Sequence, residues 1–228
     1  MSLKKRLIAV MAVAAMSIAV FTGCSSSSVM GTRYHDYIES GMKCKYYGEF
    51  DGYKKACDAT DEEAKDAYDN TVEYYAIELM TYNGISGDYI SEDMYNKYVD
   101  LAGKIMAKAK FTVGKCTKVD GDWQLKIEIS PVDINDITEE DIQKVMDEYN
   151  NAHTQDELNN STDEQYSAWE EEFAQKVLDV LSNAVNNIGY KDTVSKVVII
   201  TEDEDGYGIT DDEWYDIDDM VVDMKGVF

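Results

Sequence analysis

The strongest constraint on the fold is a change of hydrophobic period near the middle of the chain. Before residue 110 apolar residues recur at helical spacing, whereas from Phe111 to Ile129 they alternate with polar residues. Asp120-Gly121, between two alternating runs, is typical of a two-residue hairpin turn. The pattern predicts a β-hairpin, ended by Pro131, with these inner residues: Phe111, Val113, Lys115, Thr117, Val119, Trp123, Leu125, Ile127 and Ile129.

Helices are expected on both sides of this hairpin. Capping boxes, in which a Thr and an acid or amide three residues later satisfy free backbone amides reciprocally, occur at 60–63, 162–165 and 210–213. Thr138 is expected to open a further helix. The predicted helical segments are 34–47, 60–83, 91–109, 138–151, 162–188 and 210–225. Because helices and a hairpin are segregated along the chain, we expect an α+β fold with amphipathic helices packed on a small antiparallel sheet.

Two more strands are expected between the last two of these helices. Val194–Ile200 contains four consecutive aliphatic residues from Val197, which predicts a central strand covered on both faces. Tyr207–Ile209 is expected to be a short strand. The order helix, helix, strand, acidic turn, strand therefore occurs twice, at 60–131 and 138–209, either as an internal duplication or as two ordinary α+β segments.

The first residues form a distinct segment. Met1–Arg6 is basic, Leu7–Phe21 is apolar except for Ser17, and Gly23-Cys24 is followed by Ser25–Ser28. A run of fifteen residues is short for a membrane span, which needs about 20 residues. The run fits the hydrophobic core of a secretory signal peptide. An ordinary secretory signal and a buried apolar helix are the two alternatives to the lipoprotein signal described next.

This segment resembles the signal peptide and lipobox of bacterial lipoproteins, with Phe21 where Leu is usual. The resemblance implies that residues 1–23 are removed, that Cys24 is lipidated, and that a Ser-rich tether at 24–33 precedes an extracellular domain at 34–228. The protein would then lie at the cell membrane, lipid-anchored on its extracytoplasmic face.

A second resemblance covers Tyr34 to Pro131. Tyr46–Tyr53, Thr60–Ala64 and Phe111–Lys115 resemble small Gram-positive lipoproteins that carry a domain of unknown function. The long helices followed by a hairpin are also similar to cystatin-like or NTF2-like α+β folds. The resemblance implies a location and a fold, but no catalytic residues.

The chain is strongly acidic. It has 21 Lys and Arg against 46 Asp and Glu, a net charge of −25, and the part from Cys24 onward carries −28. A charge this negative argues against nucleic acid, and against an anionic membrane surface, as an electrostatically attracted partner. Attachment to the membrane is therefore expected through the N-terminal lipid alone.

The residues that usually carry catalysis are scarce. Cys44, Cys57 and Cys116 are expected to be buried thiols, with a Cys44–Cys57 disulfide as the alternative. His35 and His153 are expected to be solvated. Because no motif of a nucleophilic enzyme or metalloprotease is present, we do not expect an enzyme.

One segment suggests a metal. Counting Gly206 as position 6 of a calcium-binding loop places Asp203, Asp205 and Asp212 at positions 3, 5 and 12. Thr201 and Asp212 stand where Asp and a bidentate Glu are usual. Weak calcium binding is thus one interpretation, and a solvated acidic turn before a capped helix is the other; no other cofactor is expected.

Tyrosines offer the last candidate surface. Tyr68, Tyr75 and Tyr82 share the inner face of one predicted helix and are expected in the core, whereas Tyr46, Tyr47 and Tyr53 surround a glycine-containing break and are expected at the surface.

Taken with the leader, these features favour a non-enzymatic surface lipoprotein that binds or scaffolds an envelope protein or a wall glycan. A module that captures a small ligand in an NTF2-like cavity, and an envelope hydrolase that uses acidic residues, are the alternatives.

Overall fold

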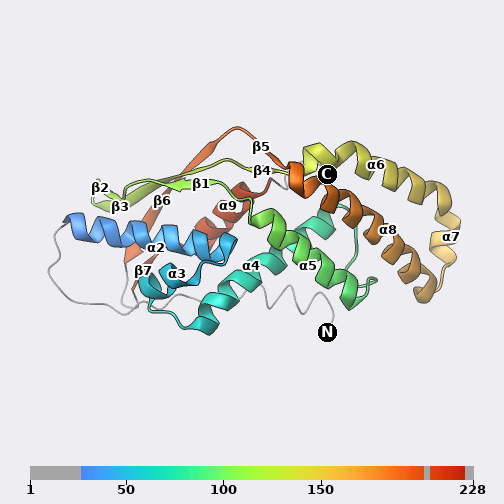
Figure 1. The fold of residues 1–228 in the computed structure, drawn as a ribbon, viewed down its shortest axis with the longest axis horizontal. Helices are drawn as coiled ribbons and strands as arrows, with labels where there is room; N and C mark the ends of the chain where they lie inside the picture. The colour runs from blue at the N-terminus through green and yellow to red at the C-terminus, as the bar shows by residue number, and fades with distance from the viewer. Residues whose placement is uncertain (1–26, 203–205, 224–228) are drawn as a thin grey trace.

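The computed structural model describes residues 27–202 and 206–223. These residues form eight α-helices packed on an antiparallel sheet, which confirms the predicted α+β class. Figure 1 shows the sheet and α2 at one end of the molecule and α6, α7 and α8 at the other. The helices are α2 (Ser27–Tyr47), α3 (Phe50–Cys57), α4 (Asp61–Tyr82), α5 (Glu92–Met106), α6 (Asn135–Ala152), α7 (Gln155–Asn160), α8 (Asp163–Ala184, then a 3-10 turn at Val185–Asn187) and α9 (Asp211–Val221).

Threonine caps define most of the helix starts. Thr60, Thr162 and Thr210 form the predicted capping boxes, and Thr154 forms another before α7. The prediction for Thr138 is wrong, because α6 already begins at Asn135. The Thr138 hydroxyl donates to the carbonyl of Ile134, 2.8 Å away, inside the first turn of the helix.

Strand β3 (Asp122–Ile129) lies in the middle of the sheet. On one side it pairs with β1 (Phe111–Val113) and β2 (Thr117–Val119), and on the other with β6 (Val194–Glu202), which pairs in turn with β7 (Tyr207–Gly208); all pairs are antiparallel. A second, two-stranded sheet joins β4 (Val132–Asp133) to β5 (Gly189–Tyr190).

The hairpin is confirmed, but its first strand is bulged. In β3, Leu125, Ile127 and Ile129 are buried as predicted, and the turn residues Asp120 and Gly121 have φ of 52° and 108°. Val113 pairs with Ile127, and Thr117 pairs with Gln124. Three residues, 114–116, therefore lie opposite two residues, 125 and 126. The extra residue reverses the alternation. Cys116 is therefore buried, and the residues predicted to face inward here, Lys115, Thr117 and Val119, are exposed.

Gly114 makes the bulge possible. Its backbone N–H donates to the carbonyl of Lys126, 2.8 Å away, and a Cβ at Gly114 would lie 2.8 Å from that same oxygen. A side chain would therefore displace the two strands.

The prediction that β6 is covered on both faces is wrong. Val198 and Ile200 are 0% and 4% exposed, whereas Val197 and Ile199 are 56% and 41% exposed. Antiparallel sheets commonly keep one face in solvent, and the aliphatic run here reflects strand propensity rather than burial.

Helices α2 and α9 cover the inner face. The rings of Tyr34 and Trp123 are 5.3 Å apart, and those of Tyr37 and Trp214 are 6.5 Å apart, both edge to face. Helix α2 begins at Ser27, not at the expected Tyr34, so residues 27–33 of the expected tether are helical. Gly31 packs closely on the hairpin, since a Cβ there would lie 2.7 Å from the carbonyl oxygen of Cys116.

Helices α5, α6 and α8 extend the core away from the sheet. The Tyr98 hydroxyl of α5 donates to the carbonyl of Ala174 in α8, 2.8 Å away, and the rings of Tyr149 and Phe173 join α6 to α8 at 5.0 Å. Within residues 27–202 and 206–223, no helix has the length and apolarity needed to cross a bilayer.

The register of β3 can be tested with a matched pair of substitutions. Ile127 is fully buried, whereas Lys126 faces solvent beside Glu128. Ile127→Thr loses apolar burial and inserts a hydroxyl into the core, so we expect a loss of about 2 kcal/mol or more in the free energy of unfolding. Lys126→Thr should cost less than about 1 kcal/mol, because it removes an exposed ion pair. Urea denaturation measures both, and equal losses would contradict the register.

Candidate functional site

The predicted site residues fall largely outside the described part of the chain. Cys24 lies before Ser27, and Asp203 and Asp205 lie in the undescribed segment 203–205, so lipidation and calcium binding stay predictions. Asp212 is exposed in the first turn of α9. Among the described residues, no group of three or more His, Cys, Asp or Glu side chains is arranged to hold a metal ion.

The carboxylate of Asp218 on α9 is a buried charged group, with 5% exposure. Lys45 Nζ lies 2.6 Å from Asp218 Oδ2, and the Tyr46 hydroxyl donates to Asp218 Oδ1 at 2.5 Å. Tyr75 of α4 donates its hydroxyl to the backbone carbonyl of Asp218. The ammonium group of Lys45 also lies 4.9 Å from the centre of the Trp214 ring. We call Lys45, Tyr46, Tyr75 and Asp218 the buried node.

The buried node joins helices rather than performing acid–base chemistry. Both carboxylate oxygens of Asp218 already accept a hydrogen bond or ion pair. Burial, with the Asp218 charge beside it, raises the pKa of the Tyr46 hydroxyl well above its usual value, so that group is neither an acid nor a base near neutrality. The node thus fixes α2, α4 and α9 against one another.

The node predicts strong coupling between its two charges. Lys45→Met leaves the Asp218 carboxylate buried without its ion partner, and we expect a loss of about 3–5 kcal/mol in the free energy of unfolding. Adding Asp218→Asn removes the stranded charge and keeps an acceptor for Tyr46, so the double variant should be more stable than Lys45→Met alone. Purely additive losses in urea denaturation would show that the two charges are not coupled.

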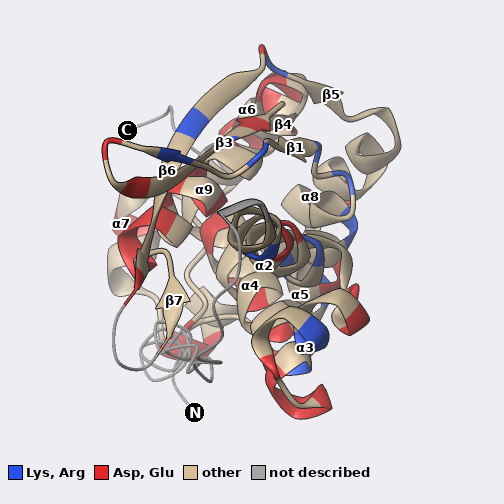
Figure 2. Cartoon of the chain, turned by 90° about the vertical axis from the view of Figure 1, so that its left-hand side faces the viewer, with Lys and Arg blue, Asp and Glu red and all other residues tan. Residues whose placement is uncertain are grey.

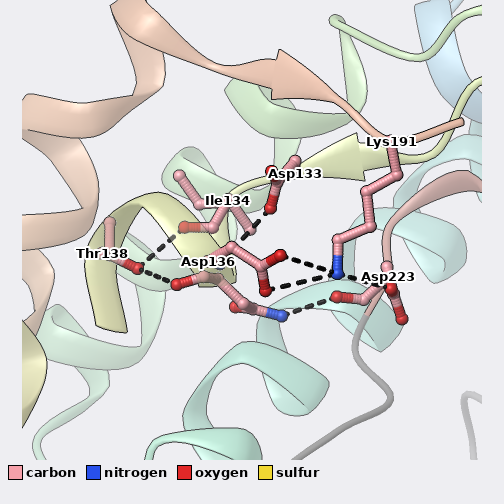
Figure 3. A network of polar contacts seen from close by, with 7 residues as sticks. Asp133, Ile134, Asp136, Thr138, Lys191 and Asp223 are labelled. Carbon is pink, nitrogen blue, oxygen red and sulfur yellow. Dashed lines mark hydrogen bonds and ion pairs between the residues drawn. The ribbon is translucent and has the colours of Figure 1, made fainter. Parts of the chain in front are cut away.

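A second polar network ties the end of α9 to the small sheet. Lys191 Nζ lies 2.8 Å from Asp223 Oδ2 and 3.2 Å from Asp136 Oδ2 (Figure 3). The hydrogen bond to Asp223 is the main cause that raises the pKa of the Lys191 ammonium group. The Asn135 side chain donates to the backbone carbonyl of Asp223 at 2.6 Å. Lys191 and Asn135 both bind Asp223, so this network holds the last described residues in place.

A third buried charge links α8 to the connection between α4 and α5. Glu170 is 3% exposed, and its Oε1 accepts a hydrogen bond from the backbone N–H of Ser86 at 2.6 Å. Burial raises the pKa of the Glu170 carboxyl, and the Ser86 hydrogen bond opposes that shift.

The Glu170 shift predicts a pH dependence of stability. Because the pKa is higher in the folded than in the unfolded state, the contribution of Glu170 is greatest below the unfolded pKa and is lost as pH rises through the folded pKa. Relative to Glu170→Gln, the wild type should therefore lose free energy of unfolding as pH rises from about 4 to 7. Urea denaturation across this range measures it, with Glu140→Gln on α6 as a control for net charge. Parallel curves for the wild type and Glu170→Gln would contradict the assignment.

The described cysteines and one of the histidines are packed inside the fold. Cys44, Cys57 and Cys116 are free and buried, as expected. Burial raises the pKa of the Cys44 and Cys57 thiols to about 11 and about 12, which keeps both in the unreactive protonated form. His153, expected to be solvated, is half-buried, with its ring 4.3 Å from that of Trp169.

The tyrosine predictions are only partly right. Tyr75 is buried as expected, but Tyr46 and Tyr53, predicted at the surface, are 0% and 4% exposed. Their position near the α2–α3 break suggested exposure. Tyr46 is instead buried against Asp218 of α9 and Phe111 of β1. Tyr53 is buried where α3 packs on α2. Tyr47 is 36% exposed and stacks on Phe111 at 5.5 Å.

A lysine-rich stretch is the surface feature that the sequence analysis missed. Residues 101–119 contain five lysines and no acidic residue, in a chain with a net charge of −25. Four exposed lysines lie at this edge of the sheet: Lys108, Lys110 and Lys115 before or after β1, and Lys118 within β2. We call these four residues the lysine edge; Lys104, in the last turn of α5, precedes them. Counting acids and bases in windows, rather than over the whole chain, would have found it.

Aromatic rings hold the lysine edge in place. The hydroxyls of Tyr47 and Tyr190 donate to the carbonyls of Ala109 and Lys108, at 2.7 and 2.9 Å. Lys110 Nζ lies 5.1 Å from the centre of the Tyr190 ring, and Lys118 Nζ 5.9 Å from that of Trp123. In Figure 2, blue segments lie on and beside β6, β3 and β1, and red segments lie on α6, α7 and α9 and also at the turn end of the sheet beside β6.

The lysine edge is suited to binding anions rather than to catalysis. Its ammonium groups donate hydrogen bonds but carry no acceptor, so they cannot ligate a metal ion while protonated. Lysines also protect a sheet edge from pairing with other strands. That role accounts for lysine at an edge strand, but not for the absence of acidic residues over 19 positions.

Comparison with known proteins gives a likeness of fold. No protein-family model and no curated protein sequence matches the chain. A crystal structure that matches is that of a putative lipoprotein (ycdA) from Bacillus subtilis, with a TM-score of 0.57 and 14% sequence identity. The match covers 83% of this chain and 56% of that one, so this chain spans little more than half the length of the Bacillus protein. At 14% identity the two share a fold.

Proposed function

We propose that the protein is a lipid-anchored, non-enzymatic binding or scaffolding protein on the extracytoplasmic face of the cell membrane. Gly23-Cys24, behind a basic and apolar leader, is the observation that carries the proposal. The fold likeness to a putative lipoprotein of Bacillus subtilis supports it.

The start of α2 fits an anchor at Cys24. The helix begins at Ser27, and Gly31 already packs on the carbonyl of Cys116. Three residues of chain reach at most about 11 Å, so a lipid on Cys24 would hold the folded domain close to the membrane. Stable anchoring requires two or more acyl chains or a second attractive contact.

The buried chemistry fits a binding role better than a catalytic one. The thiols of Cys44 and Cys57 are protonated, and the carboxylate of Asp218 is fully used within the fold. The partner would be an envelope protein or a wall glycan, bound at the surface.

Cys24→Ala tests the anchor. In bacteria that express the full chain, this variant should lose incorporation of labelled fatty acid and should leave the membrane fraction or remain unprocessed. Ser25→Ala is the matched control and should incorporate label as the wild type does. Undiminished fatty-acid labelling of Cys24→Ala would contradict the proposal.

A further inference from the structure

We propose that the lysine edge docks on the anionic phospholipid headgroups of the membrane that carries the anchor. This inference rests on the proposed function and adds a second contact with the membrane, made by Lys108, Lys110, Lys115 and Lys118. It also revises the expectation, drawn from net charge, that an anionic lipid surface only repels the protein.

The first argument is local charge. Among the described residues, Lys43, Lys45, Lys54, Lys65, Lys126, Lys144, Lys176, Lys191 and Lys196 each form an ion pair with Asp or Glu. No such ion pair is found, in the same described set, for the four members of the lysine edge. Their charges are therefore available to an anionic partner in a protein that is otherwise acidic.

Screening makes this local charge decisive. At physiological ionic strength the Debye length is about 8 Å, so acidic residues on distant helices contribute little to the potential at the lysine edge. The nearest acids in sequence are Asp100 before the stretch and Asp120 and Asp122 at the hairpin turn, with Glu128 on the neighbouring strand. Glu49 also lies near Tyr47. These acids limit the attraction at the turn and beside Tyr47, whereas the segment 104–118 itself carries only positive charges.

The second argument is position. The contact of Gly31 with the carbonyl of Cys116 places the start of α2 against the segment that carries Lys115. The stacked rings of Tyr47 and Phe111 place the other end of α2 beside Lys110. Helix α2 is about 30 Å long, and the extended segment from Lys110 to Lys118 spans about 25 Å, so the two run side by side. An anchor three residues before α2 would bring this edge to the membrane surface.

The third argument is that two partly exposed tyrosine rings lie beside the lysine edge. Tyr47 and Tyr190 are 36% and 44% exposed, and each lies against the backbone between Lys108 and Ala109. Tyrosine rings and lysine side chains are typical of the boundary between water and lipid, where the ring or stem meets apolar groups and the polar end meets headgroups.

The test uses the lipidated full protein, purified in detergent and reconstituted into vesicles. One set of vesicles is phosphatidylcholine alone, and the other contains 30% phosphatidylglycerol; neither lipid has a reactive amine. The rate at which a membrane-impermeant reagent acetylates each lysine is measured by peptide mass spectrometry at 0.1 M and 1 M salt. A third arm adds soluble poly(glycerol phosphate) to the phosphatidylcholine vesicles, because a wall polymer offers the same phosphate chemistry.

In phosphatidylglycerol vesicles at 0.1 M salt, Lys110, Lys115 and Lys118 should be acetylated about fivefold or more slowly than in phosphatidylcholine, since several lysines act together. The protection should vanish at 1 M salt, where the Debye length is about 3 Å. Exposed lysines elsewhere, Lys65 and Lys144, should not change between the two lipids.

Variants give a second, independent measurement. In the triple variant Lys110→Gln, Lys115→Gln, Lys118→Gln, phosphatidylglycerol should no longer slow the acetylation of Lys108. The matched triple variant Lys55→Gln, Lys65→Gln, Lys144→Gln removes the same charge elsewhere, and its Lys108 should still be acetylated more slowly in phosphatidylglycerol.

Each remaining outcome overturns the proposal in a recognisable way. Binding of the protein to the vesicles is measured by flotation in a density gradient. If the protein floats with both kinds of vesicle but each lysine is acetylated at the same rate in both, the anchor stands and the docking of the lysine edge is refuted. Failure to float with either kind would refute the anchor at Cys24, and the docking with it. Protection by poly(glycerol phosphate) without protection by phosphatidylglycerol would assign the edge to a wall polymer instead of lipid.

Discussion

The buried carboxylate of Asp218 is the group on which the arrangement of the helices depends. A charge with 5% exposure is tolerated only where partners replace water, and Lys45, Tyr46 and Tyr75 supply them from α2 and α4. Trp214 and Ile217 lie on the same face of α9 as Asp218 and are buried in the core. One face of this helix therefore both satisfies a buried charge and builds the core.

The distribution of charge carries the functional argument. Acidic residues gather in the first turns of α4, α8 and α9, where free backbone amides favour negative charge. Most described lysines neutralise an acid nearby, and the lysine edge does not. A protein with a net charge of −25 thus presents one positive edge, beside the helix that follows the proposed anchor. The net charge favours solubility, whereas the lysine edge is the part of the surface that an anionic membrane can approach.

The sequence predicted the features that depend on local chemistry. Capping boxes at Thr60, Thr162 and Thr210 and the alternation in β3 are set within a few residues, and all are confirmed. Features that depend on distant contacts were missed. The bulge at Gly114 reverses the faces of Thr117 and Val119, and only the register with β3 reveals it. Tyr46 is buried against α9 and β1, and Tyr53 is buried where α3 packs on α2.

The candidate site was harder to predict for the same reason. The lysines of residues 104–118 are plain in the sequence, but their position at a free sheet edge beside α2 follows from tertiary packing. Cys24, by contrast, was proposed from its neighbours alone, and its role is a matter of processing rather than of packing.

Native-state hydrogen exchange, measured on α2, α4 and α9, tests most directly whether the buried node unites the fold. If these helices are held by one buried carboxylate, their slowest amides should share one opening free energy, equal to that of global unfolding. Asp218→Asn should lower the opening free energy of all three helices together. Exchange of the slowest amides of α9 at a much lower free energy than those of α2 and α4 would contradict the account.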